Sequence, residues 1–313
     1  MKKKISYIFP IYNECDNIPL LYEMISSVVR PIKRYTFELI FVNDGSSDTS
    51  IDLLQDIAKK DSRVIVVDFS RNFGHQIAVT AGIDYASGDA IIIMDSDLQD
   101  PPKISLELIK EWENGYDVVY AQRRTRKDTF FKKFTANMYY RTLRSLADID
   151  IPVNTGDFRL ISRVVADELK KYHEHNRFLR GMISNVGFKQ KAVLFDRDER
   201  HAGETGYPLR KMLKFAADGI LGFSTVPLRL ISRLGFIMAS MSFIAIIYAL
   251  GVKFFMPDQV VDGWTFIVIS IFLVGGIQLI MLGVLGSYIG RIYTEVQDRP
   301  LYSIQRVIKK NNR

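Results

Sequence analysis

Apolar runs alternate with amphipathic stretches along the first half of the chain. The runs are short and rich in β-branched residues, which is typical of strands, and the stretches between them carry apolar residues at helical spacing. Strands that alternate with helices of about a dozen residues predict a doubly wound α/β domain with a mainly parallel sheet. We expect strands at residues 5–11, 37–42, 64–69, 91–94 and 116–121, and helices at 16–29, 50–60 and 75–86.

Polar side chains follow three of the predicted strands. The first strand runs into Tyr12 and Glu14, the second into Asp44, and the fourth into Asp95 and Asp97. In open α/β sheets, ligands bind outside the carboxyl ends of the strands. These side chains therefore lie where a ligand is expected.

Asp95 and Asp97 form a candidate metal site. Two carboxylates at this spacing reach one ion where a strand gives way to a turn, and Mg²⁺ or Mn²⁺ prefers such oxygen ligands. The structural alternative is a solvated turn, because turns favour Asp and Ser. No GxGxxG pattern follows the first strand, which weakens an NAD or FAD interpretation.

Two long apolar runs dominate the end of the chain. Leu234–Val252 holds 19 residues without a charge, and Trp264–Gly290 holds 27 with only Gln278 strongly polar. A bilayer span needs roughly 20 residues, so we expect two transmembrane helices, with a buried core hairpin as the alternative. Basic residues cluster before the first run and after the second, whereas the connection carries only Lys253. This pattern predicts a multi-pass protein of the cytoplasmic membrane with both termini and the folded domain in the cytoplasm.

Composition adds few further limits. The chain has 42 basic and 35 acidic residues, a net charge of +7 that an anionic membrane surface explains as well as nucleic acid does. Because two membrane spans are predicted, we expect the membrane to be a partner and nucleic acid not to be one. A single cysteine excludes an internal disulfide and fits a reducing compartment. Lys2–Lys4 is followed by a short apolar stretch broken by Pro10, so no signal peptide is predicted.

The segment before the first span has one apolar face. Residues 209, 212, 213, 216, 220 and 223 fall within one arc of a helix, which favours an interfacial helix over a soluble core helix. We therefore divide the chain into a folded α/β domain (1–205), a juxtamembrane segment (206–230), and a two-helix hairpin with a basic cytoplasmic tail (231–313). Gly283, Gly286 and Gly290 form a small-residue face that suits helix pairing, within the chain or in a homo-oligomer.

Several motifs in order resemble one known family. IFPIYNE (8–14), then Val42 to Gly45, and DFSRNFGHQIAVTAGIDYASGDAIIIMDSDLQDPP (68–102) look like glycosyltransferase family 2, in its polyprenyl-phosphate branch. The resemblance covers residues 5 to about 225, and the two C-terminal spans resemble those of bacterial members. It implies a GT-A (Rossmann-like) nucleotide-sugar domain.

The resemblance also implies roles for individual residues. Arg123 matches an arginine that contacts phosphate, and Arg200 lies on a loop, RHAGETGYP, that carries a second phosphate ligand. Gly206 in this loop departs from the lysine that family members often have. The nucleotide pocket is implied to contain Pro10, Tyr12, Glu14, Val42 and Asp44, and the metal site Asp95, Asp97 and Gln99.

Asp157 lies in the segment NTGDFRLISR (154–163). The resemblance implies that it is the catalytic carboxylate, whereas the structural alternative is a cap for a helix beginning near Arg159. A lipid monophosphate has a second pKa of about 6, so most of the acceptor is a dianion at neutral pH. Our hypothesis is that Asp157 acts only in part as a base, and that it also orients the acceptor or the sugar hydroxyls.

The function implied by the resemblance is inverting transfer of a hexose to undecaprenyl phosphate at the cytoplasmic membrane face. Glucose from a UDP-sugar is favoured, and the product would be a lipid-linked sugar donor for cell-envelope glycosylation. One alternative is a processive polysaccharide synthase, although neither Trp112 nor Trp264 follows a QxxRW pattern. Another is a non-catalytic membrane-anchored nucleotide-sugar-binding protein. The four histidines, His75, His173, His175 and His201, lack metal-ligand spacing and are interpreted as polar or capping residues.

Overall fold

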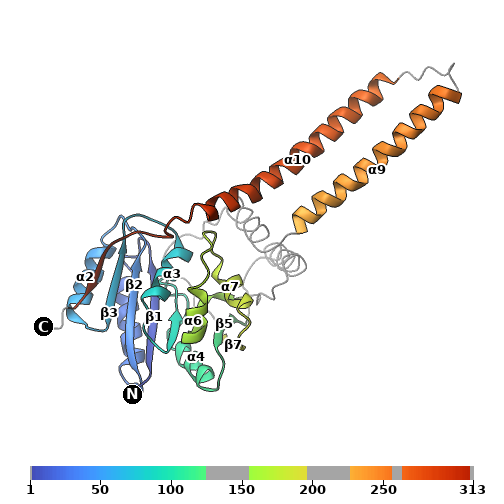
Figure 1. Ribbon diagram of the computed structural model, residues 1–313. Helices are drawn as coiled ribbons and strands as arrows, with labels where there is room; N and C mark the ends of the chain where they lie inside the picture. Colours follow the sequence, from blue (N-terminus) through green and yellow to red (C-terminus); the bar gives the residue numbers. More distant parts are fainter. Residues whose placement is uncertain (1, 125–154, 196–225, 256–262, 311–313) are drawn as a thin grey trace.

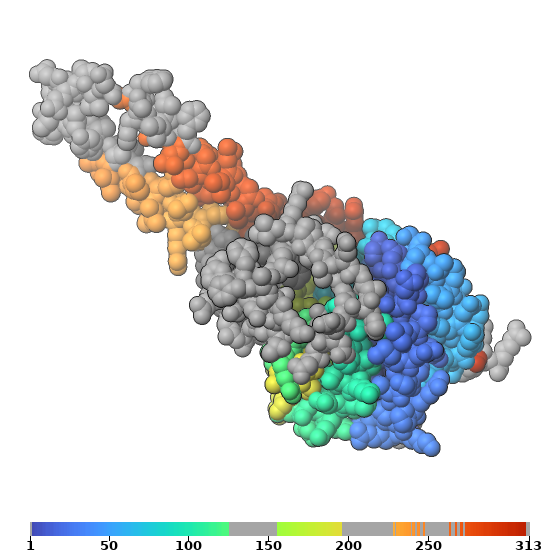
Figure 2. All heavy atoms as spheres, turned by 180° about the vertical axis from the view of Figure 1, so that it is seen from behind, coloured from blue at the N-terminus to red at the C-terminus, as the bar shows by residue number. Residues whose placement is uncertain are grey.

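The structure is a computed structural model that describes residues 2–124, 155–195, 226–255 and 263–310 (Figure 1). An α/β domain contains the first two of these ranges, and two long helices, α9 (Val226–Phe255) and α10 (Trp264–Val296), extend away from it. Seen from behind, the two helices also extend from one side of the domain (Figure 2).

One mixed sheet organises the domain. Among the described residues it has eight strands in the order β7-β5-β6-β4-β1-β2-β3-β8. The central strands β4, β1, β2 and β3 are parallel, while β6 and β8 run antiparallel to their neighbours. The strands are β1 (Lys4–Ile11), β2 (Thr36–Asn43), β3 (Val64–Phe69), β4 (Ala90–Ile93), β5 (Val118–Arg123), β6 (Thr155–Ser162), β7 (Gln190–Phe195) and β8 (Ile304–Lys309).

Helices cover both faces of the sheet. Alternate residues of a strand point to opposite faces, so Tyr7 and Phe9 of β1 pack into one core and Ile8 into the other. The first core is closed by α1 (Ile18–Val29), α2 (Ser50–Lys60) and α4 (Ile104–Glu113). The second is closed by α3 (His75–Tyr85), α6 (Arg163–Leu169) and α7 (Leu179–Asn185).

The observed α/β fold confirms the predicted fold class, with a sheet that is mainly parallel and has antiparallel strands added to it. The interpretation of Asp157 as the cap of a helix near Arg159 is wrong, because both residues lie in β6 and the next helix begins at Arg163. Strand β6 is held by β4 on one side and β5 on the other. Its extended state is therefore set by tertiary pairing, which overrides the local capping signal.

The C-terminal segment joins the sheet of the α/β domain. β8 pairs antiparallel with β3 and forms the edge of the described sheet, and Val67 faces Val307. Asp68 of β3 is buried, and its two oxygens accept hydrogen bonds from Asn43 Nδ2 at 2.7 Å and Arg306 Nε at 2.8 Å. Arg306 thus binds β8 to Asp68 of β3, which in turn is bonded to Asn43 of β2. The sequence alone predicts only a basic tail here.

The long helices expose apolar side chains over most of their described length. Within the described residues, Leu273–Val296 of α10 is long and apolar enough to cross a membrane. None of its most apolar part is buried inside the protein. Phe236 and Phe243 of α9 are also exposed. The first predicted span lies within α9, and the two-span hairpin stays a prediction.

Substitution of Arg306 tests the attachment of β8. Arg306→Ala removes a charged donor from the buried Asp68, which costs about 1–2 kcal/mol because the carboxylate loses one of its partners. We expect the thermal unfolding midpoint of the detergent-purified protein to fall by about 2–8 °C. Lys310→Ala, which removes an exposed 3.2 Å hydrogen bond to Lys60 O, is the matched control and should change the midpoint little. Equal midpoints for both variants would contradict the role of Arg306.

Candidate active site

The loops after β1 and β2 are bound to each other. The two strands are parallel, with Ile11 paired to Asn43, and Asp44 N donates to Ile11 O at 2.8 Å. Asn13 adopts a left-handed conformation with φ of 55°, and its side chain accepts a hydrogen bond from Ser47 N at 2.8 Å. Both loops therefore form one continuous edge beside the carboxyl ends of the strands.

Asp44 fixes a third loop against this edge. Its buried carboxylate accepts hydrogen bonds from the backbone N–H groups of Phe73 at 2.7 Å and Gly74 at 2.9 Å. Burial raises the pKa of Asp44, and these two hydrogen bonds oppose the shift. Gly74 has φ of 101°, which favours glycine, and it turns the chain directly into α3. Asp44 thereby sets where α3 begins.

The predicted nucleotide-pocket residues differ in exposure. Tyr12 is 51% exposed and Val42 is fully buried in the core. Pro10 is buried, and its carbonyl oxygen accepts a hydrogen bond from Ser96 Oγ at 3.0 Å. Glu14 accepts a hydrogen bond from Asn17 Nδ2 through its carboxylate. Tyr12 and Glu14 thus lie on the loop after β1, and Pro10 and Val42 lie beneath it as support.

The acidic turn after β4 is tied to the strand beside it. Ser96 Oγ makes the hydrogen bond to Pro10 already described, and Asp97 Oδ1 accepts a hydrogen bond from Gln99 N at 3.1 Å. Leu98, with φ of 58°, reverses the chain, and Gln99 is buried. Asp95, Asp97 and Gln99 therefore belong to one compact turn.

Antiparallel pairing brings Asp157 to this turn. Ile93 of β4 is paired with Arg159 of β6. Continuing the register by two residues sets Asp157 across from Asp95. The entry of β6 thus lies at the same edge of the sheet as the exit of β4, although the two carboxylates are 62 positions apart in the sequence.

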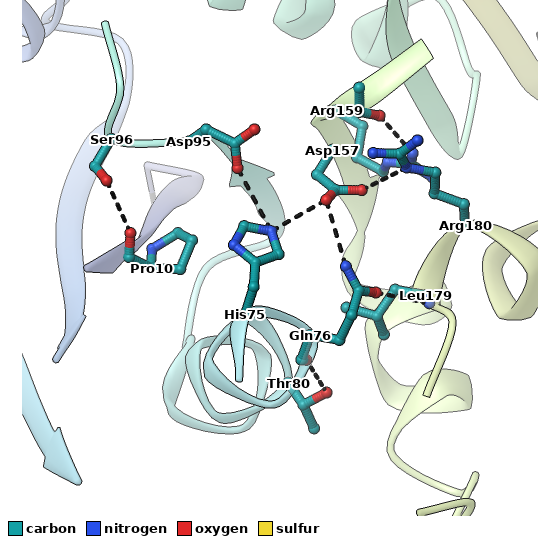
Figure 3. Close-up of polar contacts among 11 residues, drawn as sticks. Pro10, His75, Gln76, Thr80, Asp95, Ser96, Asp157, Arg159, Leu179 and Arg180 are labelled. Atoms are coloured by element: carbon teal, nitrogen blue, oxygen red, sulfur yellow. Dashed lines mark hydrogen bonds and ion pairs between the residues drawn. The ribbon is translucent and has the colours of Figure 1, made fainter. Parts of the chain in front are cut away.

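Asp157 is held by side chains from two helices (Figure 3). His75 Nε2 lies 3.0 Å from Asp157 Oδ2, and Arg180 Nε donates to Asp157 Oδ1 at 2.7 Å. Gln76 Nε2 donates to Asp157 Oδ2 at 3.4 Å, while the oxygen of the same amide accepts a hydrogen bond from Leu179 N at 3.0 Å. His75 Nε2 also lies 3.5 Å from Asp95 Oδ1 and so sits between the two carboxylates.

The two carboxylates have opposite pKa shifts. Burial would raise the pKa of Asp157, but the hydrogen bond from His75 and the charge of Arg180 outweigh it and lower the pKa. Burial raises the pKa of Asp95 to about 6, where His75 opposes the shift and the charges of Asp157, Asp100 and Asp97 add to it. Asp157 is therefore a stable anion, and Asp95 is a carboxylate whose charge needs a further cation.

The residues at this edge fit a divalent cation. Asp95 Oδ1 is buried and has no hydrogen-bond partner among the residues that the structure describes. His75, Asp95 and Asp157 each offer a ligand atom, and these atoms lie within 4.8 Å of one another. Asp95 belongs both to this cluster and to the predicted set with Asp97 and Gln99. Carboxylate and amide oxygens are the donors that Mg²⁺ or Mn²⁺ prefers.

Arginines lie around the acidic turn. Arg123, at the end of β5, places Nη2 3.8 Å from Asp100 Oδ1 and next to Gly156. Arg159 is buried, donates to Gly156 O at 2.9 Å, and has its pKa lowered to about 10 by burial. The predicted phosphate ligand Arg123 is thus beside the acids. Arg200 and Gly206 lie outside the described residues.

Sequence reasoning missed the groups that hold Asp157. The interpretation of His75 as an ordinary polar or capping residue is wrong, because its ring binds Asp157 and approaches Asp95. Its position offered a signal, since it begins the helix that follows β3 at the carboxyl edge of the sheet. Arg180 offered none, because α7 reaches the site only through tertiary packing.

A mainly parallel sheet with acids gathered at the carboxyl ends of its strands has the organisation of a GT-A glycosyltransferase domain. Comparison with known proteins agrees. The sequence profile described as "Glycosyl transferase family 2" matches residues 6–170, more than half of the chain. The protein therefore belongs to glycosyl transferase family 2, as its motifs predict, and it is a glycosyltransferase.

Curated relatives match over nearly the full length. The "Uncharacterized glycosyltransferase YkcC" of Bacillus subtilis (strain 168) is 52% identical over 98% of this chain and 95% of its own. The "Prophage bactoprenol glucosyl transferase homolog" of Escherichia coli (strain K12) is 40% identical over 98% and 100%. The "Bactoprenol glucosyl transferase" of Shigella phage SfII is 40% identical over 99% of each chain. These relatives support the predicted polyprenyl-phosphate branch.

Substitution of Gly45 tests how the edge formed by the loops after β1 and β2 is assembled. Its φ is +64°, and a Cβ there would lie 2.4 Å from Arg71 C and 2.5 Å from Asn72 N, so the loop that Asp44 holds must move. We expect Gly45→Ala to weaken UDP or GDP binding at least about tenfold in isothermal titration, since a lost charged hydrogen bond is worth about 1.5–3 kcal/mol. Gly115→Ala is the control, because Gly115 also has positive φ (+92°) but no atom within 4 Å of the added Cβ. Unchanged binding by Gly45→Ala would contradict this assembly.

Proposed function

We propose that the protein transfers a hexose from a nucleotide sugar to a polyprenyl phosphate at the cytoplasmic face of the membrane, with inversion at the anomeric carbon. UDP-glucose is the favoured donor and undecaprenyl phosphate the favoured acceptor. The product would be a lipid-linked sugar donor for cell-envelope glycosylation. The observation that carries the proposal is the pair of carboxylates, Asp95 and Asp157, on a domain continuous with an apolar helix.

The two carboxylates suit the two ends of a displacement. Asp95, with Asp97 and Gln99, would hold a divalent cation, Mg²⁺ or Mn²⁺, which offsets the charge of the diphosphate as it leaves. Arg123, and Arg200 from the predicted loop, would bind the phosphates directly. Tyr12 would stack on the base, and Glu14 and Asp44 would lie next to the base or ribose. Asp157 would face the acceptor.

Asp157 is better suited to orienting the acceptor than to removing its proton. A lowered pKa makes a carboxylate a weak base, and His75 and Arg180 lower that of Asp157. The phosphate acceptor needs little deprotonation, because its second pKa is about 6. We infer that Asp157 fixes the sugar hydroxyls or the acceptor for attack on the anomeric carbon, so that one C–O bond forms as the bond to the diphosphate breaks.

The membrane part of the proposal rests on both long helices. The exposed apolar faces of α9 and α10 would lie in the bilayer as a two-helix hairpin. The basic residues that flank the predicted spans favour a cytoplasmic catalytic domain. Sugar and lipid identity are supported by the names of the relatives, which describe bactoprenol glucosyl transferases.

A labelled-donor assay tests this function. Membranes containing the full chain would be incubated with undecaprenyl phosphate, Mn²⁺ or Mg²⁺, and labelled UDP-glucose beside UDP-galactose, UDP-N-acetylglucosamine and GDP-mannose. We expect label from UDP-glucose in a lipid that releases sugar in mild acid, and loss of this label with EDTA. Label found only in a water-soluble polymer would favour a polysaccharide synthase, and no label from any donor would favour a non-catalytic protein.

The role of Asp157 predicts a particular pH dependence. Asp157→Asn should lower kcat by about a hundredfold, the loss expected when a reacting group is misplaced. The factor should be similar at pH 6 and pH 8, because orientation does not depend on protonation of the acceptor. Asp167→Asn, which changes an exposed carboxylate, is the control and should leave kcat unchanged. A large loss at pH 6 with little loss at pH 8 would establish Asp157 as a base and overturn the orienting role.

A further inference from the structure

The end of α10 is bound to the catalytic domain through His175. Glu295 lies in the last turn of α10, and its Oε1 accepts a hydrogen bond from His175 N at 2.9 Å. Its Oε2 lies 3.0 Å from His175 Nδ1. On the other side of the ring, His175 Nε2 lies 2.7 Å from Arg299 O. One side chain of the domain thus contacts both the helix and the segment that leaves it.

Both ring nitrogens of His175 face acceptors. A neutral imidazole donates only one hydrogen bond, whereas the protonated ring donates two. The hydrogen bond to Glu295 raises the pKa of His175, with further contributions from Arg299 O and from the charges of Glu295 and Asp298. Among the described residues, His175 thus makes two contacts with the Glu295 carboxylate and one with Arg299 O. When its ring is protonated, the contact with Glu295 is an ion pair of defined geometry.

Five residues after His175, the same segment reaches the catalytic carboxylate. Arg177 Nη1 donates to Thr80 Oγ1 of α3 at 3.5 Å. Leu179 N, at the start of α7, donates to the side chain of Gln76 at 3.0 Å, and Arg180 donates to Asp157 at 2.7 Å. Residues 175–180, which we call the coupling segment, thus contact α10 at one end and Asp157 at the other.

The segment after α10 limits movement of the helix end further. Tyr302 stacks on Phe69 with ring centroids 5.1 Å apart, and its hydroxyl donates to Asp84 of α3 at 2.8 Å. Strand β8 follows at once and pairs with β3. The end of α10 is therefore held in a defined position on the domain, and His175 contacts it there.

We propose that His175 and Glu295 are a positioning pair, which sets Asp157 at a defined height above the membrane through the coupling segment. The proposal rests on the proposed function, because the acceptor phosphate must reach Asp157 from the bilayer. Glu295 lies at the end of Leu273–Val296, the stretch of α10 that is long and apolar enough to cross a membrane, and five residues beyond Gly290, where the predicted span ends, which is about 7–8 Å along a helix. A lipid phosphate at the membrane surface would then meet the carboxylate of Asp157, whose distance from the membrane is fixed by the end of α10.

Kinetics with the lipid acceptor test the pair. In liposomes containing undecaprenyl phosphate, His175→Ala and Glu295→Ala should each lower kcat by about tenfold or more, since small misplacement of a reacting group costs up to about a hundredfold. The KM for UDP-glucose should stay within about twofold, because the loops after β1 and β2, where the nucleotide is proposed to bind, are unchanged. The double variant should lose no more than the worse single variant, because both residues serve one contact.

Two further variants sharpen the comparison. Glu295→Gln keeps the shape and one acceptor oxygen, so its kcat should lie between those of the wild type and Glu295→Ala. Glu168→Gln removes an ion pair to Lys171 of 2.6 Å, nearby in the sequence and outside the coupling segment, and should match the wild type. Wild-type kcat in every His175 and Glu295 variant would overturn the proposal, as would additive losses in the double variant.

Hydrogen exchange separates this inference from the proposed function. In Glu295→Ala, amides of residues 176–185 should exchange faster than in the wild type, while those of α2 should be unchanged. This measurement needs no substrate, so it judges the link whatever the reaction is. Unchanged exchange in residues 176–185 would refute the coupling segment. Faster exchange together with no sugar transfer by the wild type would refute the proposed function alone.

Discussion

The close approach of two carboxylates, Asp95 and Asp157, is the constraint on which the site depends. Like charges at a partly buried edge repel, so they need cations between or beside them. His75 lies between them and Arg180 lies on the far side of Asp157. The result is asymmetric, because Asp157 is neutralised by protein groups while one oxygen of Asp95 is left without a hydrogen bond in the described structure. The different roles proposed for the two carboxylates follow from this asymmetry.

The placement of His75 depends in turn on the loop after β2. Asp44 binds the backbone of Phe73 and Gly74, and Gly74 starts the helix on which His75 is the first residue. A change at the loop after β2 is thus transmitted to the group between the two carboxylates. Through Asp84, the same helix accepts a hydrogen bond from Tyr302, which lies in the segment that follows α10. α3 is therefore in contact with the loop after β2, the two carboxylates and the C-terminal segment.

Much of the fold could be predicted because its central strands are continuous apolar runs. The strand 64–69 and the helix 50–60 agree with the prediction residue for residue, since local pattern and tertiary setting favour the same state. Strands β6 and β8 carry charged residues such as Arg159 and Arg306, and their extended state comes from pairing with distant strands. In the site, the acids follow a strand-end rule, whereas the approach of Arg180 depends on how α7 packs. No periodicity in the sequence encodes that packing.

The order of the chain has a consequence for how the protein is made. β3 is synthesised early and has one open edge until β8 arrives, and β8 consists of residues near the end of the chain. An unpaired strand edge is prone to pairing with other chains. Because α9 and α10 precede β8, the sheet is completed only after both long helices have been translated. Translation that stops within α10 would leave a domain with the acids in place, an open β3 edge, and a buried Asp68 without Arg306.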